Sequence, residues 1–98
     1  MKYNIIRTDK ADEGIRHTVL YLANHFGNKF ALEKLDYIEN TISLLKDNPY
    51  IGRRIDDNIY KYVMLNIKSV LYYEIHEDSN TIIIFDLKAF KENRRKND

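Results

Sequence analysis

Two nearby segments of the sequence carry cations of the kind that bind a phosphate chain. Arg53 and Arg54 follow Gly52, and Lys61 lies between Tyr60 and Tyr62. Cleavage of RNA by its own 2′-hydroxyl needs a group that removes the 2′ proton, a group that protonates the leaving 5′ oxygen, and cations that stabilise the strained phosphate. These three cations are therefore candidates for a site that binds an anionic macromolecule.

Proton transfer would fall to the tyrosines and the histidine downstream of Lys61. Tyr72, Tyr73 and His76 carry groups that can donate or accept a proton. The C-terminal tail contains neither histidine nor tyrosine, so it supplies no second group of this kind. The catalytic residues stay unassigned, and the candidates are Arg53, Arg54, Lys61, Tyr72 and His76.

Positive charge is placed unevenly, although the formal net charge is only +1. Between Lys88 and Asp98 five cations stand against two acids. The predicted target-binding residues are Arg53, Arg54, Lys61, Lys88, Lys91, Arg94 and Arg95. The low net charge makes general RNA or DNA binding the weakest interpretation, because such binding draws on a strong positive field.

Length and composition limit the number of domains and the kinds of cofactor and membrane contact to expect. The 98 residues suit one domain over residues 1–98, with a basic tail from about residue 88. Cysteine is absent, and no histidine or carboxylate set has ligand spacing, so we expect no metal and no cofactor. No apolar run approaches the roughly 20 residues that span a bilayer, and no signal peptide is visible. A cytoplasmic protein without membrane contact is expected.

The first half of the chain predicts one strand and two helices. Residues 3–7 alternate as a short strand, and Thr8 or Asp9 can cap the helix that follows, to about Phe26. Residues 28–46 form the second helix, whose apolar positions step by four, three, four and three. The connection at Gly27 is so short that the helices must form an antiparallel αα-hairpin.

The second half predicts a loop and an antiparallel meander. Residues 50–58 read as a loop, and residues 60–65, 70–75 and 81–87 read as strands rich in β-branched and aromatic side chains. The last strand is apolar on both faces over residues 82–85, which predicts a central strand covered on both sides.

These elements predict a two-layer α+β fold, with the N-terminal strand and the αα-hairpin packed on one face of an antiparallel sheet. The hairpin can cover only one face. We expect the other face to present Tyr60 or Tyr62, Tyr72, the loop arginines and the tail.

The order of elements and several local motifs resemble the RelE/ParE superfamily of type II toxin–antitoxin toxins. The motifs are Tyr3-Asn4-Ile5-Ile6-Arg7-Thr8 with Ala11, Leu44-Leu45-Lys46-Asp47-Asn48-Pro49 followed by Gly52-Arg53-Arg54, and the strand pair Tyr60-Lys61-Tyr62-Val63-Met64-Leu65 and Val70-Leu71-Tyr72-Tyr73-Glu74-Ile75. The similarity extends to about Phe85. It implies a toxin that a cognate antitoxin neutralises, in a possible toxin–antitoxin hetero-oligomer.

The resemblance leaves the mechanism open. RelE-like members cut mRNA on the ribosome, and ParE-like members act on DNA gyrase. Lys61 matches the basic residue on the first meander strand of RelE-like toxins, but their next arginine falls at about Val70 here. We therefore expect a ParE-like toxin that binds its target, with a metal-independent, ribosome-dependent endoribonuclease as the alternative. A degenerate, non-toxic protein-binding module is the second alternative.

Overall fold

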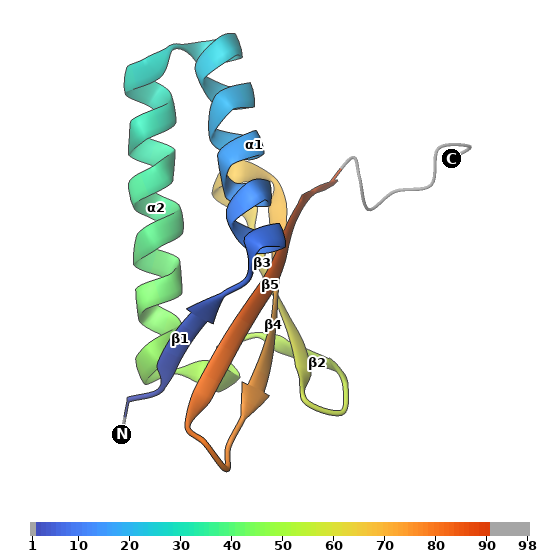
Figure 1. Cartoon of the computed structure of the whole chain (residues 1–98). Helices are drawn as coiled ribbons and strands as arrows, with labels where there is room; N and C mark the ends of the chain where they lie inside the picture. The colour runs from blue at the N-terminus through green and yellow to red at the C-terminus, as the bar shows by residue number, and fades with distance from the viewer. Residues whose placement is uncertain (1, 91–98) are drawn as a thin grey trace, which may run out of the picture.

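The computed structural model describes residues 2–90, in which two helices pack on one side of a five-stranded sheet (Figure 1). The elements in chain order are β1 (Asn4–Arg7), α1 (Asp9–Phe26), α2 (Asn28–Asp47), the 3-10 turn η1 (Pro49–Ile51), β2 (Arg53–Asp56), β3 (Ile59–Met64), the 3-10 turn η2 (Leu65–Ile67), β4 (Ser69–His76) and β5 (Thr81–Ala89).

The strands follow the order β1-β5-β4-β3-β2, so β1 and β2 form the two edges. The pairs β2–β3, β3–β4 and β4–β5 are antiparallel, as the predicted meander requires. The N-terminal strand β1 runs parallel to β5, with Asn4 opposite Thr81 and Arg7 opposite Ile84. The predicted two-layer α+β fold is confirmed, with a sheet that is mixed because of this one parallel pair.

The αα-hairpin is fixed by local sequence signals. The Thr8 hydroxyl accepts a hydrogen bond from the Ala11 backbone N–H at 3.1 Å, which caps the first turn of α1. Gly27 alone separates α1 from α2, and its φ of 94° is a conformation that side chains other than glycine rarely adopt. Asn48 and Pro49 end α2, because proline disfavours the helical conformation at the residue before it.

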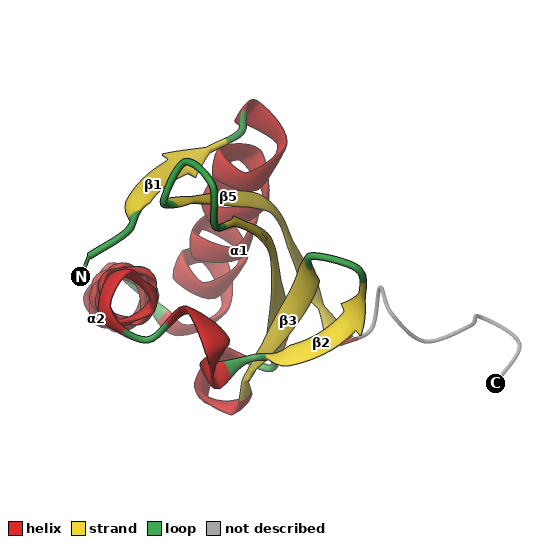
Figure 2. Cartoon of the chain, turned by 90° about the horizontal axis from the view of Figure 1, so that it is seen from below, coloured by secondary structure: helices red, strands yellow, loops and turns green. Residues whose placement is uncertain are grey.

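The core lies between the hairpin and one face of the sheet. Helical side chains such as Ile15, Ile38 and Leu45 are buried against strand residues such as Tyr73 and Ile84. From Leu71 to His76 buried and half-buried residues of β4 alternate, which confirms the predicted face of Leu71, Tyr73 and Ile75. Figure 2 shows both helices on the same side of the curved sheet. No segment within residues 2–90 covers the opposite face, here called the open face.

Three predictions about the second half of the chain need correction. The stretch predicted as a loop contains η1 and the edge strand β2. Tyr60 and Tyr62 pack on the helix-side core and do not line the open face, because they stand opposite the core residues Tyr73 and Leu71. The strand β5 is interior, but residues 2–90 cover it on one side only, and it continues to Ala89, which places Lys88 inside the strand.

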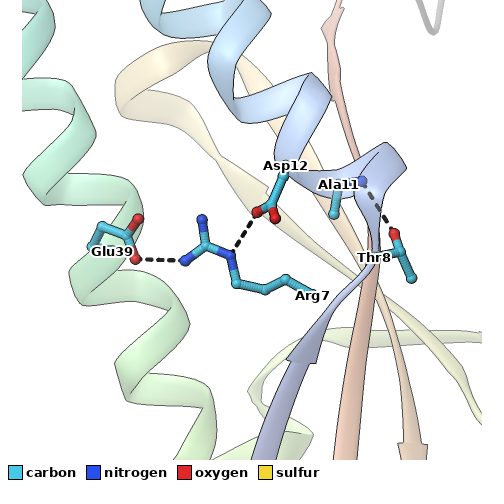
Figure 3. A network of polar contacts seen from close by, with 5 residues as sticks. All are labelled: Arg7, Thr8, Ala11, Asp12 and Glu39. Atoms are coloured by element: carbon cyan, nitrogen blue, oxygen red, sulfur yellow. Dashed lines mark hydrogen bonds and ion pairs between the residues drawn. The ribbon is translucent and has the colours of Figure 1, made fainter.

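Arg7 ties the end of β1 to both helices (Figure 3). Its Nε donates to Asp12 Oδ1 at 2.9 Å in the first turn of α1, and its Nη1 donates to Glu39 Oε1 at 2.8 Å on α2. The Arg7 side chain is 29% exposed and each carboxylate side chain 45%, so water screens both ion pairs. The contribution to stability is therefore modest.

We expect the Arg7→Ala variant to lose roughly 1 kcal/mol of unfolding free energy, because both ion pairs disappear together. Chemical denaturation measures this loss, and high salt should reduce it. The control is Arg16→Ala, which removes an exposed cation from α1. Equal stability of the two variants would show that the Arg7 bridge contributes nothing.

Candidate functional site

A row of side chains crosses the open face from edge strand β2 toward β5. Residues directly opposite each other on antiparallel strands share one face of the sheet. Arg53 stands opposite Lys61, and Lys61 stands opposite Tyr72. Since strands lie about 4.8 Å apart, the row places two cations and a phenol within roughly 10 Å. We call Arg53, Lys61 and Tyr72 the cationic row.

The other predicted cations take different positions. Arg54 stands opposite Tyr60 on the helix side of the sheet, and its Nε donates to the Asp57 carbonyl at 2.7 Å. Lys88 stands opposite Val70, with its Nζ 3.8 Å from Asp86 Oδ2. The cationic row thus contains neither of them. The remaining predicted target-binding residues, Lys91, Arg94 and Arg95, lie outside the described residues.

Arg53 is held in place by a buried hydroxyl beneath β2. The Tyr73 hydroxyl donates to the Pro49 carbonyl at 2.8 Å and accepts from the Gly52 N–H at 3.1 Å. Tyr73 is fully buried, so these two bonds fix the backbone on both sides of η1 from within the core. Gly52 is required at this position, because an added Cβ would lie against the Tyr73 hydroxyl and 2.7 Å from the Lys61 carbonyl. We call this arrangement the Tyr73 clamp.

A buried carboxylate sets the electrostatics at the β5 end of the row. Asp86 stands opposite Tyr72 and is 7% exposed. Lys10 on α1 offsets its charge from 3.3 Å, together with Lys88. Burial, and then the negative charge of Asp86, raise the pKa of Tyr72. At neutral pH Tyr72 is a phenol that can donate a hydrogen bond, and it is a poor general base.

The other proton-transfer candidates are separated from the cations. Tyr73 faces the core, where the clamp occupies its hydroxyl. His76 lies four residues along β4 from Tyr72, about 13 Å at the rise of a strand. Its Nε2 is 2.8 Å from Glu74 Oε1. Within residues 2–90 the cationic row and the histidine therefore cannot act on one phosphate.

The described part of the chain contains neither a metal-ligand cluster nor a membrane-spanning helix. Within residues 2–90, no three histidine or carboxylate side chains meet in a group that could hold an ion. Among the same residues, no helix combines the length and the apolar character needed to cross a bilayer.

Two features of the site escaped the sequence analysis. Asp86 is not among the site residues predicted from the sequence, although an acid within a strand indicates that a charge partner is needed. Tyr73 was considered for proton transfer, but its place on the core face of the alternating β4 pattern indicates a structural hydroxyl. Its partners in η1 lie more than 20 residues upstream, and no local pattern identifies them.

Comparison with known proteins identifies the family. Residues 5–92 match the family model of the ParE toxin of the type II toxin–antitoxin system parDE. This match extends over most of the chain, and the chain belongs to that family of toxins. A search of curated proteins finds no significant match.

Solved toxin structures share the fold at low sequence identity. A chain of the chromosomal ParDE toxin–antitoxin system of P. aeruginosa superposes with a TM-score of 0.77 at 14% identity, with 90% of this chain and 96% of that one covered. A chain of the RelBE2 toxin–antitoxin complex of Mycobacterium tuberculosis gives 0.68 at 14% identity, covering 91% and 99%. A chain of the E. coli RelBE complex gives 0.66 at 12% identity, covering 89% and 95%. The predicted membership of the RelE/ParE superfamily is confirmed.

We expect the Tyr73→Phe variant to be about 1–3 kcal/mol less stable than the parent, because the Gly52 N–H and the Pro49 carbonyl lose their partner. Backbone amides of β2 should exchange with deuterium faster. Tyr62→Phe is the matched control, since Tyr62 packs on the same core but its hydroxyl bonds to no described residue. Equal exchange rates for β2 in the two variants would contradict the clamp.

The Tyr73 clamp should also make the unfolding free energy depend on pH. Burial raises the pKa of Tyr73 to about 12, and the Gly52 N–H only partly offsets this rise. An unfolded tyrosine titrates near pH 10, so between about pH 10 and 12 the folded state binds more protons and its stability falls as pH rises. The unfolding free energy of the parent should fall more steeply over this range than that of Tyr73→Phe. Parallel curves would show that Tyr73 does not contribute.

Proposed function

We propose that this toxin arrests growth by binding and obstructing a macromolecular target through its open face, with DNA gyrase as the target. The observation that carries the proposal is the cationic row, beside which residues 2–90 place a buried and already paired carboxylate, Asp86, and no histidine. Arg53 and Lys61 can hold an anionic surface, whereas Asp86, the carboxylate opposite Tyr72, is 7% exposed and paired with Lys10 and Lys88, so it is poorly placed to act as the base in RNA cleavage. Obstruction requires only affinity, so nothing is missing for this mode of action.

The family supports both the target and the partner in this proposal. ParE-type toxins act on gyrase, and the family model that matches this chain is that of ParE. An antitoxin partner is supported by family membership and by the toxin–antitoxin complexes that share the fold. In the cell the free toxin would act in the cytoplasm, where gyrase and the antitoxin are found.

A RelE-like nuclease is the second candidate, and one observation favours it. Lys61 holds the place of a basic residue in RelE-like toxins and stands on the open face beside Tyr72. A phenol with a raised pKa could protonate a leaving oxygen, but Asp86, the carboxylate opposite it among residues 2–90, is buried and held by Lys10 and Lys88 and so is poorly placed to remove the 2′ proton. The two candidates can therefore be distinguished, because a nuclease would leave cleaved transcripts and a gyrase inhibitor would not.

We expect expression of the chain alone in a bacterium to arrest growth, and co-expression of the antitoxin to restore it. DNA-damage induction, together with inhibition of purified gyrase, would support the proposal. New 5′ ends within transcripts, with gyrase unaffected, would favour the nuclease. Unimpaired growth at high expression would reject both and leave a non-toxic binding module.

We expect the double variant Arg53→Ala and Lys61→Ala to weaken inhibition of gyrase at least roughly tenfold, because two cations of the row are removed. The matched control is Arg54→Ala with Lys29→Ala, which removes the same charge from outside the row. The control should inhibit as the parent does. Equal loss in both variants would show that only total charge matters and that the open face is not the working surface.

A further inference from the structure

The open face has an apolar half beside the cationic row. Ile6 on β1 stands opposite Ile83 on β5, and Ile83 stands opposite Glu74 on β4. Ile6 is 51% exposed and Val63 on β3 is 45% exposed. Phe85 packs its ring against Tyr72, with the centroids 6.2 Å apart. Aliphatic side chains thus reach water beside the cations, on a face that no described segment covers.

Arg53 and Lys61 differ from the cations of β1 and β5 in having no acidic partner among the described residues. Among residues 2–90, no carboxylate lies within 4.0 Å of Arg53 or Lys61. By contrast, Lys10 and Lys88 share Asp86, and Arg7 holds two acids. The unpaired positive charge is therefore on β2 and β3, while β1 and β5 present Ile6 and Ile83 beside the Asp86–Lys88 ion pair.

A phosphate chain fits this face poorly. Nucleic acids are held by many cations along the backbone, and here the described face offers two unpaired ones with a carboxylate, Glu74, on the same side. Bases stack on free aromatic faces, but the rings of Tyr72 and Phe85 are tilted against each other at 33°. Contact between a phosphate and Ile6 or Ile83 would not favour binding. Burial of these two side chains against apolar side chains of a partner would favour binding.

We propose that the open face binds a polypeptide segment in which acidic residues are interleaved with apolar ones. Its carboxylates would pair with Arg53 and Lys61, and its apolar side chains would cover Ile6 and Ile83. Five strands span about 19 Å, a distance that about six extended residues cross. This inference rests on the proposed function, since it names the kind of surface that the target would present to the same face.

The test measures binding of the full chain to three fluorescent probes. The first is a peptide of about six Glu-Leu repeats, the second is the same peptide with glutamine in place of each glutamate, and the third is a uridine oligonucleotide of similar length. We expect the acidic peptide to bind at least roughly tenfold more tightly than the other two. Affinity for the acidic peptide should also fall as salt rises.

Variants locate the bound peptide on the molecule. Arg53→Gln with Lys61→Gln should weaken binding of the acidic peptide roughly tenfold, and Ile83→Gln should weaken it several-fold. The matched controls lie on the helices: Arg16→Gln with Lys29→Gln for charge, and Leu32→Gln, which is 60% exposed, for apolar surface. Both controls should bind as the parent does, and thermal melts confirm that each variant is folded.

Several results would overturn the inference: no binding of the acidic peptide, equal or tighter binding of the oligonucleotide, or equal losses in the helix controls. These results are separable from failure of the proposed function. A chain that binds the peptide at the open face but leaves growth and gyrase unaffected contradicts the proposed function. A chain that inhibits gyrase but prefers RNA or the neutral peptide contradicts this inference alone.

Discussion

Five strands have two faces, and an αα-hairpin has one apolar side with which to cover them. The single residue Gly27 joins α1 to α2, so both helices must lie together on the same face. Alternation along β4 then buries Leu71, Tyr73 and Ile75 and turns Tyr72 the other way. The open face is thus a consequence of the short connection, and it is the surface of the sheet on which a partner can act.

The helix-side core also controls what the open face presents. Tyr73 is buried among the helices and strands, yet its hydroxyl fixes Pro49 and Gly52 and so holds the edge strand β2. Arg53 lies on a four-residue edge strand that is exposed throughout, so the clamp at the start of this strand helps to hold it in place. Asp86 acts from the other end, where it occupies Lys10 and Lys88. Among the cations of the described face, Arg53 and Lys61 are therefore the ones without an acidic partner within 4.0 Å.

Much of the fold could be predicted from the sequence because the signals are local. The Thr8 cap, the positive φ of Gly27, the helix end before Pro49 and the alternation of β4 all depend on near neighbours in the chain. The predictions were wrong where contacts between residues far apart in the sequence determine the structure. The bonds from Tyr73 hold residues 49–52, which no nearby pattern shows, and the following residues then pair with β3 as an extra strand. The same pairing turned Arg54 toward the helix side and left Arg53 in the row.

In the proposed mode of action, the toxin contacts its target through the open face. Methyl-labelled isoleucine and leucine residues distinguish the two sides of the molecule, since Ile6 and Ile83 lie on the open face while Leu20 and Leu32 lie exposed on the helices. The direct measurement is the NMR spectrum of these methyl groups as purified gyrase is added. We expect the Ile6 and Ile83 signals to broaden first, with Leu20 and Leu32 unchanged. Broadening of the helix signals, with Ile6 and Ile83 unaffected, would contradict the claim.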